Sequence, residues 1–318
     1  MWRRILLAVA LLQPALAYAQ TYPSKPVRMV VPSSPGGASD LVARMIASPL
    51  ADALGQPFVV ENRVTSGGII GTQQVAEAAP DGHTLLVTFD TFAINPFLFR
   101  NLKWDPVRDF APVMQLCRYP QVLIVHPGLG VHTLKEFVAL AKEKGPQLNY
   151  GSAGPASSSR LAYELFKQVA GIETVPVHYK GGGPAIQDLL AGQVQVMLIQ
   201  GGGTIQQHVK SGKLIALGVS SREPSKFYPG VPTIAQTYPG FETHSWVAMF
   251  APAATPKPVI ERLHGALARI MADPLARERF EAQGCEIVGG TPEDLARLVR
   301  EEQAKWAPII REQHITIE

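Results

Sequence analysis

Three turns rich in glycine and serine are the parts of this chain best suited to hold an anion. They span residues 34–40, 66–68 and 151–159, with the sequences SPGGASD, SGG and GSAGPASSS. Each turn follows a β-rich run and precedes a helical pattern. Glycine lets backbone N–H groups approach a ligand closely, and a helix start offers unpaired N–H donors with a partial positive charge. Such turns can hold a carboxylate or phosphate without lysine or arginine.

The alternative is that these turns are ordinary capped connections, which every α/β protein contains. The turns at 34–40 and 151–159 come from separate blocks of the chain, and both offer hydroxyl groups as well as backbone amides. This combination favours a binding role over a purely structural one.

The elements that would position these turns alternate between short β-rich runs and amphipathic helical runs. Such alternation is typical of parallel α/β layers, whose ligands bind at the carboxyl ends of the strands. We predict strands at 27–31, 58–61, 84–88, 122–125, 148–151, 174–178, 194–199, 214–220 and 245–251, with helices between them.

Local signals set several boundaries of the helices. Thr133 and Glu136 have the spacing of a capping box, and Gly171 fits a C-terminal cap after a helix over 157–169. Pro49 should kink the helix that opens near Ser39, or end it early. Residues 89–96 are expected to form a polar and aromatic loop.

The N-terminus has the pattern of a secretory signal peptide over residues 1–19. Arg3 and Arg4 precede an apolar run at 5–12, and Ala17-Tyr18-Ala19 provides a cleavage signature. The alternative is an uncleaved anchor, although the apolar run is shorter than the ~20 residues that a spanning helix needs. We expect a soluble periplasmic protein that begins near Gln20, without a lipid anchor.

Composition narrows the classes of function. The formal charge of the chain is +3, and Arg3 and Arg4 of the leader account for two of these charges. The remaining chain is therefore nearly neutral, so nucleic-acid binding has no electrostatic basis. The length suits two lobes. Cys117 and Cys285 match no metal-site spacing, and a disulfide between them and two free thiols are equally compatible with the sequence.

The chain lacks the sequence patterns of the common hydrolases, metalloproteases and nucleotide-binding loops. Its eight histidines occur in no H-E-x-x-H motif, and no G-x-S-x-G elbow is present. A Ser-His-Asp set assembled only in space stays open as an alternative. We predict no catalytic residues, no metal and no cofactor.

A series of motifs in register resembles the Bug family of periplasmic receptors, also called tripartite tricarboxylate transporter receptors. The similarity covers essentially the whole mature chain. The matching segments are Val30–Asp40 (VVPSSPGGASD), Glu61–Arg63 (ENR) with Gly67-Gly68, Ala79–Leu85 (APDGHTL), Asn149–Gly154 (NYGSAG), Tyr179–Gly182 (YKGG), Ser211–Leu214 (SGKL) and Gly289–Glu293 (GGTPE).

The resemblance implies an α/β type II periplasmic-binding fold, in which two lobes with mixed sheets flanked by helices are joined by two crossings. Lobe 1 would comprise residues 20–124 and 245–318, and lobe 2 residues 125–244. The hinge would lie near 119–123 and 242–246.

In this family a ligand carboxylate is held between two strand-to-helix loops. The matching positions here are Ser34, Gly36, Gly37 and Ser39 in the first loop, and Ala153, Gly154, Ser157 and Ser158 in the second. Thr88, Asp90 and Gln200 would line the pocket beside them.

The chain departs from many relatives after the strand at 194–199. An Asp-Asn pair is common there, whereas this chain has Gln200 followed by three glycines. We therefore expect a carboxylate whose distal part is uncharged, with Phe89, Phe92 and Trp246 as candidate lining residues that also suit an ordinary core role.

The resemblance also implies partners. The receptor would be a monomer that delivers a small organic anion to membrane permease subunits of a tripartite transporter. The alternative roles are a ligand-sensing adaptor for a sensor kinase and, less favoured, a hydrolase.

Overall fold

The computed structural model describes residues 22–64 and 66–317, so the predicted signal peptide lies outside the described residues. The strands form one mixed, curled sheet. They are β1 (Val27–Val31), β2 (Phe58–Asn62), β3 (Thr84–Phe89), β4 (Phe110–Val125), β5 (Asn149–Ser152), β6 (Val175–His178), β7 (Val196–Gln200), β8 (Ile215–Val219), β9 (His244–Pro252) and β10 (Glu286–Gly289).

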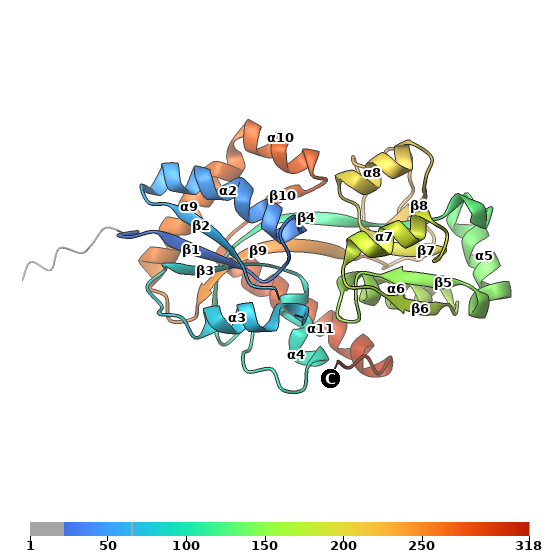
Figure 1. The fold of residues 1–318 in the computed structure, drawn as a ribbon, viewed down its shortest axis with the longest axis horizontal. Coiled ribbons are helices and arrows are strands. Elements are labelled where there is room, and N and C mark those ends of the chain that lie inside the picture. Colours follow the sequence, from blue (N-terminus) through green and yellow to red (C-terminus); the bar gives the residue numbers. More distant parts are fainter. Residues whose placement is uncertain (1–21, 65, 318) are drawn as a thin grey trace, which may run out of the picture.

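Helices flank this sheet on both faces (Figure 1). They are α2 (Ala38–Leu54), α3 (Ile69–Ala76), α4 (Thr91–Leu98), α5 (Leu134–Lys144), α6 (Ser158–Ala170), α7 (Gly182–Leu190), α8 (Gly203–Lys210), α9 (Lys257–Ala272), α10 (Pro274–Ala282) and α11 (Pro292–Glu312). The predicted α/β class is therefore confirmed.

The strand order is β2-β1-β3-β9-β4-β7-β5-β6, with β8 and β10 also paired to β4. Strands β1, β2 and β3 are parallel, as are β5, β6 and β7, whereas β4 and β9 run antiparallel to their neighbours. Strand β4 is 16 residues long and pairs with β9 and β10 along its first part and with β7 and β8 along its last part. Figure 1 shows β4 and β9 running between the two groups of elements.

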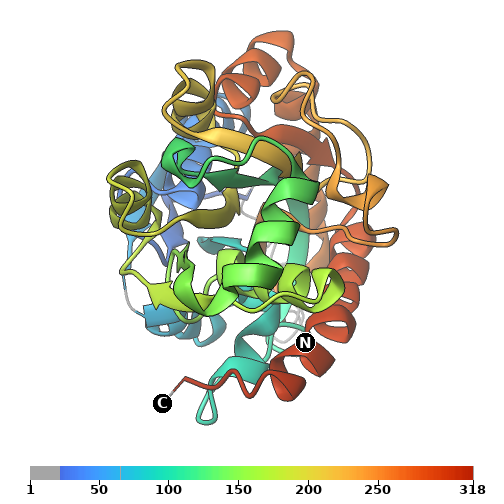
Figure 2. The ribbon, with the colours of Figure 1, turned by 90° about the vertical axis from the view of Figure 1, so that its right-hand side faces the viewer.

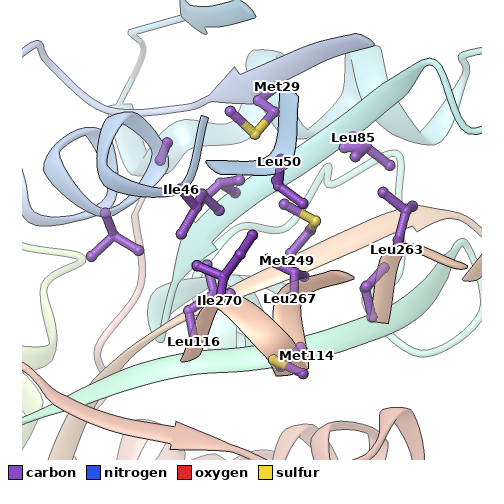
Figure 3. Packing of buried hydrophobic residues seen from close by; sticks show 14 of the residues in the cluster. Met29, Ile46, Leu50, Leu85, Met114, Leu116, Met249, Leu263, Leu267 and Ile270 are labelled. Atoms are coloured by element: carbon purple, nitrogen blue, oxygen red, sulfur yellow. The ribbon is translucent and has the colours of Figure 1, made fainter. Parts of the chain in front are cut away.

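The N-terminal and C-terminal parts of the chain share their hydrophobic core. Helices α2 and α9 pack together against β1, β3, β4 and β9, and Figure 3 shows Ile46 of α2 close to Ile270 of α9 and Leu263 of α9 close to Leu85 of β3. Helices α3, α4 and α11 contribute a second cluster around the opposite face of the same strands.

The middle of the chain has its own two clusters. Helices α5 and α6 pack on one side of β4, β5, β7 and β8, and α7 and α8 pack on the other. Helix α11 contacts α4, β4 and α6, so it lies along both groups of elements, as the side view also shows (Figure 2). The lobe limits at 124/125 and 244/245 stay a prediction.

Several local predictions are confirmed. Thr133 and Glu136 form the capping box of α5, and Gly171 closes α6 in the left-handed conformation with φ 61°. Helix α2 continues past Pro49 to Leu54, so of the two effects predicted for this proline the early end does not occur. One prediction was wrong: residues 91–98 form helix α4 rather than a loop. Helix α4 is buried over most of its length, and this burial outweighs the polar and proline-containing sequence that suggested a loop.

The two cysteines, which the sequence left open, form a disulfide. Cys117 lies on β4 and Cys285 directly before β10, with their Cα atoms 5.9 Å apart and both side chains fully buried. The bond links the centre of the chain to its C-terminal part. Within the described residues, no helix is long and apolar enough to cross a membrane.

Candidate functional site

A cavity of about 180 Å³ lies where the starts of α2, α6 and α7 converge. Elements from the terminal parts of the chain contribute Ser33, Ala38, Ser39, Phe89 and Ser245. The middle of the chain contributes Ala153, Ser157, Ser158, Ser159, Gly182, Ile199 and Gln200. Its volume corresponds to that of about six water molecules, which suits a small metabolite.

The first wall is the turn from β1 into α2. Ser39 is almost fully buried, and its hydroxyl lies 2.7 Å from that of Ser33. The backbone amides of Ala38 and Ser39 lie in the first turn of α2, where an intrahelical acceptor is lacking. This wall therefore offers amide donors and hydroxyl groups at the positive end of a helix dipole.

The glycines of this turn use their amides within the loop itself. The amide of Gly36 donates to Asp40 Oδ2 at 2.8 Å, and that of Gly37 donates to the carbonyl of Ser34 at 3.0 Å. Burial opposes ionisation of Asp40, but hydrogen bonds from Arg44, the Gly36 amide and Asn62 outweigh it and lower the pKa of this carboxyl. Ser34, Gly36 and Gly37 thus shape the turn and do not line the cavity.

The opposite wall is the turn from β5 into α6. The Ser157 hydroxyl accepts a hydrogen bond from the Arg160 amide as the N-cap and lies 2.9 Å from the Ser159 hydroxyl. The Ser159 hydroxyl also accepts from the amide of Ala153 at 2.9 Å. Among the described residues, the amides of Ser158 and Ser159 have no acceptor, so both are free to bind an anion.

The floor and sides come from three further elements. Gln200, at the end of β7, donates from Nε2 to the Ser245 hydroxyl on β9 at 2.8 Å. Gly182 is the first residue of α7, so a third helix start faces the cavity. Phe89 and Ile199 add apolar surface. These contacts join residues that are far apart in the sequence into one continuous wall.

Among the residues that the structure describes, no charged side chain lines the cavity. The nearest ionisable groups of α6 and β6 have other partners. Arg160 donates to the carbonyl of Pro155 at 2.9 Å, and His178 Nδ1 lies 2.7 Å from the hydroxyl of Ser152. Burial, together with the charge of Arg160, lowers the pKa of His178. Attraction for an anion must therefore come from backbone amides, helix dipoles and hydroxyl groups.

Two predicted residues lie behind the wall. Thr88 is buried on β3, and Asp90 follows that strand with only 3% of its surface exposed. Gly154 lies outside the lining too, and its backbone has φ +148°. Of the predicted residues, Ser39, Ala153, Ser157, Ser158 and Gln200 line the cavity. Phe89 lines it as well, whereas Phe92 and Trp246 are packed in the core.

Sequence reasoning missed Ser33, Ser159, Gly182, Ile199 and Ser245 as lining residues. Ser159 and Gly182 belong to motifs that were recognised, so their position at a helix start was a usable signal. Ser245 offers no local signal, because only the pairing of β9 with β3 and β4 brings it to the cavity.

A larger concavity of about 390 Å³ lies elsewhere, beside β4 and β9, and several of its charged groups are paired with one another. Arg118 bonds Glu286 at 2.8 Å, and His244 lies 2.9 Å from Glu242. Among the described residues, no helix start lines this larger concavity. Among the described residues, no group of histidine, cysteine, aspartate or glutamate side chains could hold a metal ion.

Residues 42–315 match the model of the tripartite tricarboxylate transporter family receptor. The chain belongs to this family. Protein BugT of Bordetella pertussis is 35% identical to this receptor over 297 residues, which cover 92% of this chain and 91% of BugT. The receptor is therefore also a relative of the Bug proteins, as the motifs indicated.

Two solved structures support the fold of this receptor. Rpa4515 of R. palustris, solved with adipate, has a TM-score of 0.85 and 31% identity, and the alignment covers 93% of this chain and all of Rpa4515. MatC of Rhodopseudomonas palustris, solved with bound malate, has a TM-score of 0.81 and 34% identity, covering 91% of this chain and all of MatC. The predicted periplasmic-binding fold is confirmed, and the protein is a solute-binding receptor rather than an enzyme.

Proposed function

We propose that this receptor captures a small organic carboxylate in the cavity between the starts of α2 and α6. The observation that carries this proposal is the convergence of free helix-start amides and serine hydroxyls on a cavity without a charged side chain. Amides and hydroxyls bind a carboxylate without the desolvation cost of burying a lysine or arginine. Adipate and malate, bound in Rpa4515 and MatC, belong to this class.

The binding residues in this proposal are Ser39 from one wall, Ala153, Ser157 and Ser158 from the other, and Gln200. Residues 20–124 with 245–318 would form one lobe and 125–244 the other, joined near 119–123 and 242–246. A carboxylate that contacts both walls stabilises the closed form over the open one, because only the closed form provides both sets of donors.

The cellular setting follows from the family. The leader over residues 1–19 would direct the chain to the periplasm, where the mature monomer delivers its ligand to the permease subunits of a tripartite transporter. Phe89 and Ile199 favour a ligand with apolar surface beyond the bound carboxylate. Among the described residues, the lining has no carboxylate that would pair directly with an ammonium group.

A calorimetric titration of the mature protein tests this proposal. The panel is adipate, malate, an aromatic monocarboxylate, aspartate and glucose. We expect adipate, malate or the aromatic monocarboxylate, or more than one of them, to bind and to raise the melting temperature in a concentration-dependent way. Binding of glucose alone, or of none of the acids, would refute the carboxylate assignment. Tight binding of aspartate alone would refute the expectation that the ligand has no ammonium group.

A further inference from the structure

Asp90 is a buried carboxyl group without a hydrogen-bond partner directly behind the cavity. It follows Phe89, which lines the cavity, and both of its carboxyl oxygens are inaccessible to solvent. Neither oxygen has a hydrogen-bond partner among the described residues. Burial of an ionised carboxylate without a partner is costly, so this position favours the neutral acid.

The polar groups nearest to this carboxyl are the hydroxyls of Ser245 and Ser158 and the backbone amide of Thr91. The two serine hydroxyls are the side-chain groups among them. Both serines line the cavity, one from the start of α6 and the other from β9. The Ser245 hydroxyl already accepts a hydrogen from Gln200, so its own hydrogen is free to turn toward Asp90 or toward a ligand. Asp90 therefore faces the ligand through two hydroxyl groups.

The protonation state of Asp90 decides what these hydroxyls offer. Each hydroxyl has one hydrogen. An ionised Asp90 accepts hydrogen bonds only, so it draws both hydrogens away from the cavity and leaves oxygen lone pairs facing the ligand. A protonated Asp90 donates its own hydrogen to one serine, and the serine hydrogens can then point into the cavity. Only the second arrangement suits an anion.

We propose, on the basis of the carboxylate function above, that the receptor binds its ligand together with one proton held on Asp90. Asp90 is then a positioning residue: it sets Ser158 and Ser245 as donors toward the ligand carboxylate. No bond forms or breaks apart from the O–H bond of Asp90, and the proton comes from solvent. The bound anion in turn stabilises the protonated acid.

The charges around Asp90 agree with this coupling. Burial raises the pKa of Asp90 to about 7; the hydroxyls of Ser245 and Ser158 and the Thr91 amide oppose the rise, and the Glu302 carboxylate of α11 adds to it. Glu302 itself accepts from the indole nitrogen of Trp306 at 2.8 Å, and burial raises its pKa as well.

The other charged groups of the neighbouring elements have partners of their own. Lys305 on α11 donates to the carbonyl of Glu242, Arg160 on α6 donates to the carbonyl of Pro155, and His244 on β9 contacts the Glu242 carboxylate. None of them has a hydrogen bond to Asp90. A cation is therefore not in place to hold Asp90 ionised.

Calorimetric titration with adipate from pH 6.5 to pH 9 tests the proposal, since adipate is almost fully ionised throughout this range. We expect the Kd of the unmodified receptor to rise about tenfold per pH unit well above pH 7, the slope for uptake of one proton. At pH 8 the binding enthalpies measured in phosphate and in Tris should differ, because each buffer supplies the proton with its own ionisation enthalpy. The difference should correspond to the uptake of nearly one proton.

Asp90→Asn is the decisive variant, because asparagine has the shape of the neutral acid and donates permanently. Its Kd should not depend on pH or on the buffer, and at pH 9 it should bind adipate about a hundredfold more tightly than the unmodified receptor. Glu302→Gln is the matched control. It removes a neighbouring negative charge but retains Asp90, so the loss of affinity should begin at lower pH.

Folding is checked separately in the absence of ligand. The raised pKa of Asp90 means that the folded protein binds more protons than the unfolded chain between about pH 4 and pH 7, so the contribution of this group to stability falls across that window. Asp90→Asn should therefore melt no lower than the unmodified receptor at pH 8.

Four results would overturn the inference. Constant affinity of the unmodified receptor across the range, or equal proton uptake in Asp90→Asn, would leave the carboxylate function standing and remove the role of Asp90. Loss of adipate binding in a folded Asp90→Asn would do the same. Failure of both proteins to bind adipate at any pH would exclude adipate as a ligand and the inference with it; the carboxylate function itself falls only if the other acids of the panel fail too.

Discussion

A negative charge placed in the cavity at Ala153 should abolish most of the affinity for a carboxylate. Ala153 lines the cavity between β5 and α6, and its backbone amide already donates to Ser159, a contact that substitution of the side chain leaves in place. Ala153→Asp is a better probe than a change at Gly154. The backbone there has φ +148°, and an added Cβ would lie 3.2 Å from the carbonyl oxygen of Tyr179.

The size of the cavity sets the magnitude of the effect. A sphere with the volume of about 180 Å³ is about 7 Å across, so two carboxylates inside it repel by roughly 2 kcal/mol at an effective dielectric constant of about 20. This corresponds to about a thirtyfold rise in Kd. Ala153→Asn is the matched control, because it adds nearly the same volume without the charge.

The assay is calorimetric titration of both variants at pH 7 with the acid that binds best in the panel, beside melting curves without ligand. The ratio of the two Kd values isolates the charge, since the steric cost is shared. Equal Kd values in two folded variants would refute the reasoning, because the anion would then lie outside this cavity.

Three predictions concern stability, each measured by urea unfolding. Replacement of both Cys117 and Cys285 by alanine should lower the free energy of unfolding by about 2–5 kcal/mol, because the disulfide closes a loop of 168 residues; an unchanged midpoint would contradict this. Leu50→Ala should cost about 2–5 kcal/mol, because Leu50 is fully buried between α2 and α9; a loss below 1 kcal/mol would show that the site collapses around the smaller side chain. Thr133→Ala should cost about 1 kcal/mol through loss of the capping box with Glu136, and Thr133→Ser, which keeps the cap, should stay close to the original stability.

Local patterns in the sequence were enough to predict the class of fold and most of the elements. The strand β1 lies at its predicted residues, and the capping signals at Thr133 and Gly171 act where they were expected. These features depend on contacts within a few residues. Helix α4 was missed, because its stability comes from burial against β9 and α11 rather than from its own helix propensity.

The candidate site likewise combines features that the local sequence predicts with features that depend on long-range packing. The sequence by itself determined that two serine- and glycine-rich turns stand at strand ends before helices, since turn chemistry is local. Only the tertiary structure decided which groups of those turns stay free. Asp40 takes up the Gly36 amide, whereas the first-turn amides of α6 have no acceptor among the described residues. Long-range packing also brings Ser245 to the cavity and buries Asp90 behind it, because burial and convergence arise only when strands distant in sequence pair.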